Sequence, residues 1–391
     1  MEAVYIVAGK RTPIGALNGA LSTVPAPALA ATALKGALAQ AGLPPEAIEE
    51  LYVGNVLSAN LGQAPATQVA VHSGLPATVV CTLVNKVCAS GTKAIMLAAQ
   101  AVMLGDRDVV AACGMENMSL VPHYVPFYRS GFKYGNTELL DGIVRDGLQD
   151  VYSGLMMGMA GELCAEKYGF SRQDQDDYAI RAYQLAAAAV ERGYFADEIV
   201  PVVIEGKKGS TSVDKDEEPG NVRYDKIPEL RPAFKKDGTI TAANASKIND
   251  GAAAVILASE SAVKKYNLKP MARIAGFADA ARQPEWFTIA PADAVPLAAK
   301  KAGISVSRLD IFEINEAFSC VALVNQKLLD VPTEKLNPNG GAVSLGHPIG
   351  CSGARLVLTL ARGLKEKNAK YGAVGICNGG GGASALVLEA V

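Results

Sequence analysis

Two segments far apart in this chain carry the same order of features, and this internal duplication constrains the fold more than any single motif. Tyr52-Val53-Gly54-Asn55 is followed by Ala89-Ser90-Gly91-Thr92-Lys93, and Phe312-Glu313-Ile314-Asn315 is followed, at a nearly equal distance, by Cys351-Ser352-Gly353-Ala354-Arg355. Around both segments, short β-rich runs alternate with Ala-rich runs of helical periodicity, which predicts βαβ units and a largely parallel sheet. We therefore expect an α/β protein whose two similar halves pack together.

The sequence between the two halves has a different character. Residues 121–148 are rich in Pro, Tyr, Phe and Gly without clean periodicity, which is typical of a functional loop or an interaction surface. Helices are expected over 154–168 and 171–192, and the second has a capping-box start at Ser171. The segment 205–237 holds eight acidic and eight basic residues. It is expected to be a solvated loop or hairpin, and the alternative is that some of its cations hold a phosphorylated ligand.

These features suggest how the chain is divided. Asn249-Asp250-Gly251 is expected to be a tight turn that leads back into a buried strand of the first half. A site is expected where strand C-termini and helix N-termini of both halves meet. The expected divisions are an N-terminal half at 1–119, an inserted loop domain at 120–248, a return to the N-terminal half at 249–270 and a C-terminal half at 271–391.

The charge and the cysteines exclude several classes of protein. A net charge of −2 and a pI near 6 offer no electrostatic attraction for nucleic acid or a membrane surface, and no apolar run reaches spanning length. A strand pattern beginning at Val4 leaves no room for a targeting segment, so we expect a cytoplasmic protein, or a mitochondrial one whose transit peptide has been removed. The seven cysteines lack C-x-x-C spacing, which argues against a disulfide framework and structural zinc.

Cys88 is the first candidate for chemistry. It follows an apolar, β-branched run and precedes a helical pattern that ends at Gly105, so it is expected at a strand-to-helix turn. Free backbone N–H groups and the positive end of the helix dipole there favour the thiolate, which is the nucleophilic form. The alternative is a small buried filler, as most free cysteines are.

Three further candidates lie at similar turns in the second half. His347 lies in a glycine-rich stretch just before a helix, and Asn315 ends a strand, either as an ordinary helix cap or as an amide that positions a water or an oxyanion. Cys377 opens a run of four glycines whose N–H groups suit a phosphate or, with the cysteine at its head, a thioester oxyanion. A nucleophile, a base, a second acid/base and an oxyanion hole together indicate acyl transfer.

The same motifs, in this order and over the whole chain, resemble the thiolase family, and the Cys-Asn-Gly-Gly-Gly-Gly ending is similar to that of the acetoacetyl-CoA thiolases. The resemblance implies duplicated α/β halves in αβαβα layers with an inserted loop domain. The motifs are Asn85-Lys86-Val87-Cys88-Ala89-Ser90-Gly91, Gly114-Met115-Glu116, Asn315-Glu316-Ala317-Phe318, Gly346-His347-Pro348-Ile349-Gly350 and Cys377-Asn378-Gly379-Gly380-Gly381.

The resemblance also implies a reaction, the reversible Claisen condensation of two acetyl-CoA molecules to acetoacetyl-CoA and CoA, as in acetyl-CoA C-acetyltransferases. Cys88, activated by His347, becomes acetylated and releases CoA. Cys377 then removes a methyl proton from the second acetyl-CoA, whose carbanion attacks the acetyl-Cys88 thioester. One oxyanion hole consists of His347 and a water held by Asn315, and the other of the N–H groups of Cys88 and Gly379.

The resemblance assigns ligand contacts to the insert, and the 121–148 loop is expected to contribute to a homotetramer. Ser246 is expected at the pantetheine of CoA. The histidine that many relatives place nearby is absent, because this chain has Met156-Met157-Gly158 there. Relatives often have an arginine at the position occupied here by Gly220 or Asn221, and Arg223 is expected to replace it. The residues expected along the nucleotide end are Tyr183, Asn221, Arg223 and Lys226.

No organic cofactor is expected, since CoA is a substrate and product, but potassium is. Some acetoacetyl-CoA thiolases bind this ion near the CoA site through a tyrosine and backbone carbonyls, and a hard cation prefers oxygen ligands. The matching residues here are Tyr183, Ala242, Ala243, Ala245 and Val343.

Three alternative functions differ in how well they fit the sequence. A broad-range 3-ketoacyl-CoA thiolase would share the same motifs but accept longer substrates. A non-catalytic acyl-CoA-binding protein on the same fold is disfavoured because both cysteines and the histidine are present. A redox or metal protein built on the cysteines fails on their spacing.

Overall fold

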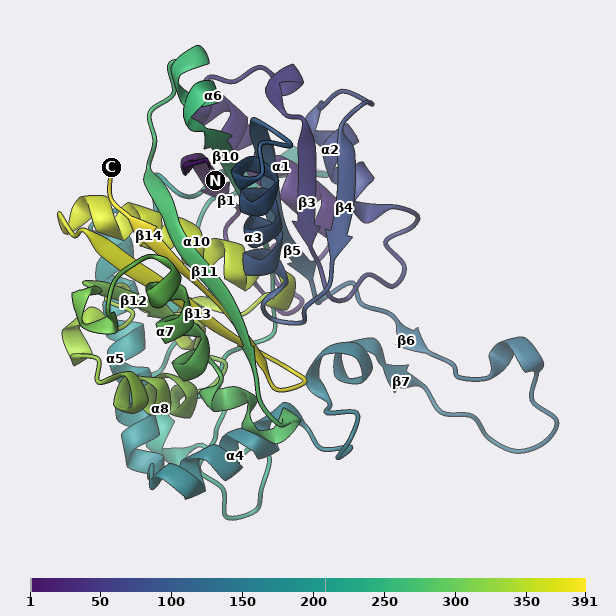
Figure 1. Cartoon of the computed structure of the whole chain (residues 1–391). Helices are drawn as coiled ribbons and strands as arrows, with labels where there is room; N and C mark the ends of the chain where they lie inside the picture. Colours follow the sequence, from purple (N-terminus) through teal and green to yellow (C-terminus); the bar gives the residue numbers. More distant parts are fainter. Residues whose placement is uncertain (1, 208) are drawn as a thin grey trace.

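The structure, a computed structural model, describes residues 2–207 and 209–391, and a sheet of ten strands runs through it (Figure 1). Its strands are β1 (Val4–Arg11), β2 (Gly15–Ala16), β3 (Glu50–Gly54), β4 (Val80–Val84), β5 (Val109–Asn117), β10 (Asn249–Ser259), β11 (Ala272–Ala281), β12 (Ile311–Ile314), β13 (Tyr371–Asn378) and β14 (Gly382–Glu389). Neighbouring strands follow the order β12-β13-β14-β11-β1-β10-β5-β3-β4, and β2 pairs with β10. The two halves meet where β1 pairs with β11.

Helices cover both halves of this sheet in layers. They are α1 (Ala26–Ala41) and α2 (Pro65–Ser73) outside the first half, α7 (Pro291–Lys301) and α8 (Ser319–Leu329) outside the second, and α3 (Ser90–Met103) and α10 (Ile349–Glu366) in the middle. One buried apolar cluster joins α3 and α10 to strands of both halves, for example through Ile95, Leu358 and Val374. Separate clusters lie beneath α1 and α2 and beneath α7 and α8. This arrangement confirms the predicted αβαβα layers.

Strand pairing repeats between the halves, as the duplication predicts. The β3–β5 and β12–β13 pairs are parallel, whereas β5–β10, β13–β14, β10–β1 and β14–β11 are antiparallel. The expected largely parallel sheet is therefore wrong: the sheet is mixed. Parallel neighbours are found at β3–β4, β3–β5 and β12–β13, whereas a tight glycine turn joins β13 to β14 and such a turn requires antiparallel strands.

The crossing of α3 and α10 is reciprocal. A Cβ added to Gly91 would lie 2.7 Å from the backbone nitrogen of Ala354, and one added to Gly353 would lie 2.5 Å from that of Thr92. The sequence repeat makes Gly91 equivalent to Gly353 and Thr92 equivalent to Ala354. The two helices therefore meet about an approximate two-fold axis, at a point where only glycine allows backbones to approach this closely.

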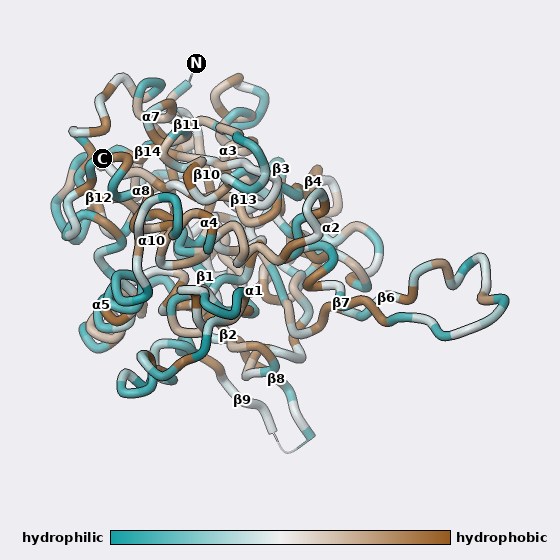
Figure 2. Tube along the Cα trace, turned by 90° about the horizontal axis from the view of Figure 1, so that it is seen from below, coloured by the Kyte–Doolittle hydropathy of each residue, from teal (hydrophilic) through white to brown (hydrophobic). Residues whose placement is uncertain are grey.

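The insert lies between β5 and β10. Its elements are β6 (His123–Tyr124), β7 (Leu140–Asp141), α4 (Met157–Tyr168), α5 (Arg172–Glu191), β8 (Val202–Gly206) and β9 (Gly209–Val213). Figure 2 shows the β6–β7 arm and the β8–β9 hairpin projecting from the body. The capping box at Ser171 is present, with Ser171 and Asp174 bonding each other's backbone N–H groups. The hairpin overlaps only the start of the segment 205–237 predicted to be a solvated loop or hairpin, and the side chains of Asp216 and Glu218 in that segment are buried.

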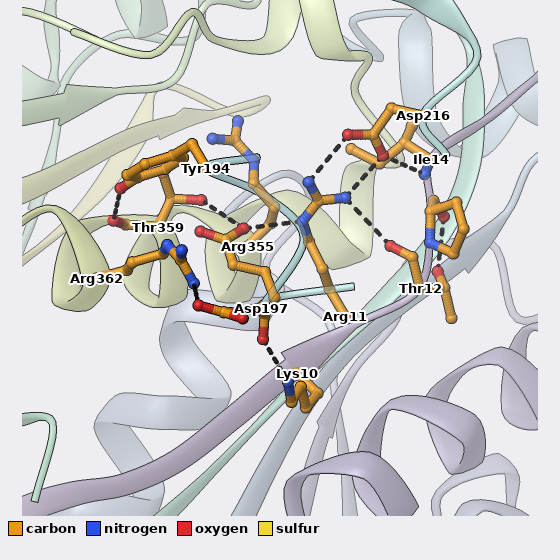
Figure 3. A network of polar contacts seen from close by, with 12 residues as sticks. Lys10, Arg11, Thr12, Ile14, Tyr194, Asp197, Asp216, Arg355, Thr359 and Arg362 are labelled. Carbon is orange, nitrogen blue, oxygen red and sulfur yellow. Dashed lines mark hydrogen bonds and ion pairs between the residues drawn. The ribbon is translucent and has the colours of Figure 1, made fainter. Parts of the chain in front are cut away.

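A buried arginine ties the insert to the body (Figure 3). Arg11, in β1, donates to both carboxylate oxygens of Asp216 at 2.7 and 2.9 Å, and its Nε donates to Glu198 at 3.0 Å. Thr359 of α10 also donates to Glu198, at 3.4 Å. A buried charge needs such complete pairing. The cluster therefore holds the part of the insert that carries Glu198 and Asp216 against both β1 and α10.

The predicted tight turn at Asn249-Asp250-Gly251 is wrong, because these residues begin strand β10 and pair with β2 and β5. The side chains bond to distant segments rather than closing a local turn: Asn249 donates to Gly15 O, and Asp250 accepts from Ser119. Within residues 2–207 and 209–391, no helix combines the length and apolar character needed to cross a bilayer.

Candidate active site

Cys88 lies in a strained turn between β4 and α3, as predicted. Val87 before it has φ +47°, a left-handed conformation that β-branched residues rarely adopt. Side chains hold the turn: Asn85 Oδ1 accepts from Val87 N at 3.0 Å, and Ser90 Oγ accepts from Lys86 N at 2.8 Å while it donates to Val87 O. This support keeps Cys88 presented at the start of the helix, and backbone strain of this kind clusters at functional sites.

His347 lies at the equivalent place before α10. The preceding Gly346 has φ +105°, and a Cβ there would lie 2.5 Å from the Asn249 side chain, so glycine is required. Asn249 Oδ1 accepts from His347 N at 2.9 Å. The histidine backbone is thus anchored to the first strand residue after the insert.

The imidazole ring lies between two side chains. Ser352 Oγ, which donates to Pro348 O at 3.0 Å, lies 2.6 Å from His347 Nδ1 and so accepts its proton. Nε2 then carries the lone pair, and Asn315 Nδ2 donates to it at 3.3 Å. Asn315 Oδ1 is buried and has no hydrogen-bond partner among the described residues. His347 is thus poised as a base beside an amide with a free acceptor.

Cys377 lies near the end of β13 and is fully buried. The turn that follows uses Gly380 and Gly381, both with positive φ. This geometry directs the Gly379 N–H to the Cys88 sulfur, and the Cys88 and Cys377 sulfurs lie close enough for the charge of one to raise the pKa of the other. The structure therefore brings Cys88, Cys377 and Gly379 together, as the sequence predicts.

The resting site is electrically neutral at its cysteine and histidine. The Cys88 side chain is partly exposed, but the protein atoms around it desolvate the sulfur and raise its pKa to about 12, which the Gly379 N–H only partly offsets. Burial and the Arg355 cation lower the pKa of His347 to about 3. The expectation of an easily ionised thiol is therefore wrong for the resting protein, because desolvation outweighs the helix dipole.

Two buried glutamates that sequence reasoning did not single out organise the strand ends. Glu116 accepts from Asn55 Nδ2 at 2.6 Å and from three backbone N–H groups, including that of Gly350 at 2.9 Å. Glu316 accepts from Tyr178 at 2.7 Å and from Val343 N at 2.9 Å. Glu116 lies near the end of β5 and Glu316 follows β12, each in a polar motif, and that placement is the sequence signal that was available.

The predicted CoA contacts fall into two groups. Ser246 N donates to Ala317 O at 3.0 Å, and Ala317 packs in the same apolar cluster as Cys377, so Ser246 lies beside the site. By contrast, three predicted contacts are exposed on the insert around the short helices η4 (Glu218–Gly220) and η5 (Tyr224–Glu229): Asn221, Arg223 and Lys226. Tyr183 is only 2% exposed, so its ring offers no surface to a ligand.

The predicted potassium ligands are partly brought together, but a lysine lies among them. Tyr183 donates to Ala243 O at 3.5 Å, and the Lys247 ammonium donates to both the Tyr183 hydroxyl and, at 3.3 Å, Val343 O. Ala245 is buried nearby in sequence, whereas Ala242 is exposed. Two cations within a few ångströms of each other repel. The residues present therefore do not fit potassium.

The sequence profile of the thiolase N-terminal domain matches residues 4–261, and that of the thiolase C-terminal domain matches residues 268–390. The chain belongs to the thiolase family. The boundary between the two matched domains falls between β10 and β11, where the chain passes from the first structural half to the second. The family recognised from the motifs is thus confirmed over almost the whole thiolase chain.

Relatives of this thiolase cover its full length. It is 54% identical over 388 residues to a cytosolic acetyl-CoA acetyltransferase, ERG10, of Gibberella zeae, which covers 99% of this chain and 98% of the relative. Acetyl-CoA acetyltransferase 2 of Arabidopsis thaliana is also 54% identical, with 99% and 96% covered. Among solved structures, an acetyl-CoA acetyltransferase from Syntrophomonas wolfei superposes with a TM-score of 0.97 at 36% identity, and the Acat5 thiolase of Ascaris suum in complex with coenzyme A with 0.94 at 42%; both comparisons cover all of both chains.

Proposed function

We propose that this thiolase is an acetyl-CoA acetyltransferase, which condenses two acetyl-CoA molecules to acetoacetyl-CoA and CoA and catalyses the reverse thiolysis. The observation that carries the proposal is the placement of Cys88 beside Cys377 and of the neutral His347 beside Asn315. The relatives' names support the choice of acetyl-CoA as substrate.

The first half-reaction acetylates Cys88. His347 Nε2 takes the thiol proton as the sulfur attacks the carbonyl carbon of acetyl-CoA, so charge develops only during the reaction. The Cys88 and Gly379 N–H groups stabilise the tetrahedral oxyanion, and CoA leaves as a thiol with the proton of Cys377, so that a Cys377 thiolate and a protonated His347 remain. The direction of the Gly379 N–H toward the sulfur supports this role.

The second half-reaction forms the carbon–carbon bond. Cys377, as a thiolate, removes a proton from the methyl carbon of the second acetyl-CoA. The protonated His347 Nε2 and a water on Asn315 Oδ1 donate to the enolate oxygen. The carbanion then attacks the acetyl-Cys88 carbonyl, and the expelled Cys88 thiolate takes its proton back from His347. The partnerless Asn315 Oδ1 supports a water-positioning role.

Coenzyme A binds against the insert in this proposal. Ser246 contacts the pantetheine, and the exposed Asn221, Arg223 and Lys226 contact the nucleotide end. The Ascaris suum thiolase, whose fold this chain shares, was solved with coenzyme A. Tyr183 is not among the proposed ligand contacts because it is buried. Potassium is not part of the proposed site because Lys247 contacts two of its predicted ligands.

We further propose a homotetramer in the cytosol. Strand β4 ends the sheet with Val80 49% exposed, which suits pairing with a second copy, and the β6–β7 arm exposes Phe127, Tyr128 and Tyr134. The seven cysteines are all free, as in a reducing compartment. Light scattering of the full chain and of a variant lacking residues 125–139 tests the assembly, because a tetramer held by the arm falls to dimers without it.

Mass spectrometry after mixing with acetyl-CoA tests the chemistry. The wild-type protein and Cys377→Ala should both carry one acetyl group, on Cys88, whereas only the wild type forms acetoacetyl-CoA. Cys113→Ala, a buried thiol beneath α1 and α2, is the matched control and should behave as wild type. Absence of an acetyl group on wild-type Cys88 would refute the enzyme proposal. Comparable thiolysis of acetoacetyl-CoA and a longer 3-ketoacyl-CoA would favour the broad-range alternative.

A further inference from the structure

Lys247 is a partly buried lysine at the end of the insert, and neither half-reaction uses it. Its ammonium donates to the Tyr183 hydroxyl and to Val343 O, and lies 4.8 Å from the centroid of the tyrosine ring. We propose that Lys247 is a built-in cation that takes the place of a bound potassium ion, so that the stability and activity of this thiolase do not depend on potassium.

The hydrogen bonds around Lys247 have consistent directions. The Tyr183 hydroxyl gives its proton to Ala243 O at 3.5 Å, which leaves its lone pairs free to accept from the ammonium. Val343 O supplies a second acceptor. A potassium ion would need the same lone pairs. The N–H groups of Lys247 therefore hydrogen-bond to these oxygens, and both acceptors are satisfied without a metal ion.

The electrostatics also favour a cation at this position. Glu218 Oε2 lies 4.0 Å from Lys247 Nζ, and the Glu218 side chain is nearly buried. Burial lowers the pKa of Lys247, and the Glu218 carboxylate partly offsets this by favouring the charged ammonium. Without the lysine, Glu218 would face the neutral Tyr183 and backbone carbonyls. The site would then be a set of oxygens with a nearby negative charge, which is suited to a monovalent cation.

The contacts of Lys247 connect it to the base. Val343 is the second residue of the short helix α9 (Ala342–Leu345), which leads through Gly346 to His347. Glu218 also accepts from Asn249, the residue whose Oδ1 accepts from His347 N. Lys247 is thus a positioning residue that acts on His347 through the α9 segment, and a cation of the wrong size or no cation would loosen that segment.

Potassium and sodium chloride at equal ionic strength test the inference. The wild-type protein should have the same melting temperature and the same thiolysis rate in both salts. Lys247→Ala opens space for an ion, so in sodium its melting temperature should fall and its rate should drop roughly 10- to 100-fold, as expected for a displaced base. Potassium should restore both. Lys247→Met keeps the volume without the charge and should show the losses in both salts.

Lys264→Ala is the matched control, because Lys264 pairs with Glu260 at the exposed surface of α6 (Glu260–Lys265). It should match the wild type in both salts. A wild-type melting temperature that rises in potassium relative to sodium would overturn the inference, and so would equal losses of Lys247→Ala in both salts. The melting temperatures need no substrate, so they decide this inference even where the acetylation experiment fails.

Discussion

Replacing Gly353 by alanine should separate the two helices that carry the reactive residues. A Cβ on Gly353 would lie 2.5 Å from both the backbone nitrogen and Oγ1 of Thr92. Ordinary van der Waals contacts begin near 3.5 Å, so α3 and α10 must move apart by about 1 Å. The Thr92 hydroxyl is able to rotate away, but the backbone nitrogen is not.

The expected magnitudes follow from that displacement. Overpacking against backbone costs about 3 kcal/mol, and alanine returns about 1 kcal/mol of helix propensity, which leaves a net loss of about 2 kcal/mol. With about 2 cal/mol/K of unfolding entropy per residue, a chain of 391 residues should lose only about 2–3 °C of melting temperature. Activity should fall about 100-fold, because a shift of about 1 Å at a reacting pair has that effect.

Calorimetry and a steady-state thiolysis assay check both values, and Gly363→Ala in the same helix is the control. A Cβ there would lie 3.3 Å from the Tyr194 hydroxyl and 3.5 Å from Ile311 Cδ1, which are side-chain atoms able to adjust. The control should keep wild-type activity with equal or higher stability. The reasoning is refuted if Gly353→Ala keeps the wild-type rate, or if Gly363→Ala loses as much.

Other predictions follow from the buried charges. Alkylation of Cys88 by iodoacetamide should rise about tenfold per pH unit from pH 7 to 10, since its pKa is about 12; a plateau below pH 9 would contradict this. Because folding lowers the pKa of His347 to about 3, stability is lost as pH falls below 6.5, so in urea titrations wild-type stability should fall by about 1.4 kcal/mol per pH unit more than that of His347→Asn. Arg11→Met leaves Glu198 and Asp216 buried without their cation and should lower the urea-unfolding free energy by about 3–5 kcal/mol; a loss under about 1 kcal/mol would show that the cluster relaxes.

Local sequence patterns predicted much of the fold and the position of the candidate site. The strand expected to end at Asn315 is β12 (Ile311–Ile314), and the capping box at Ser171 begins α5 as its spacing requires. The turn at Cys88 also lies where a strand pattern gives way to a helix pattern, and His347 lies just before a helix, as expected. Each of these depends on neighbours within a few residues, which a sequence states directly.

The features that sequence reasoning missed depend on contacts between distant segments. Asn249-Asp250-Gly251 has the composition of a turn, but its side chains find partners across the insert and extend the strand. The ionisation of Cys88 is set by desolvation from both halves, which the local helix dipole does not overcome. Lys247 follows the expected ligand motif in sequence, but only the fold shows its ammonium among the ligand oxygens.

The neutrality of Cys88 and His347 follows from the duplication itself. Each half supplies one glycine-bearing helix whose start carries a reactive group, and the approximate two-fold axis brings the two starts together inside the molecule rather than at its surface. Burial at that meeting point disfavours both the thiolate and the imidazolium. In the proposed mechanism, proton transfer from Cys88 to His347 therefore accompanies attack on the substrate carbonyl, and the close packing of Gly91 and Gly353 sets the geometry in which it occurs.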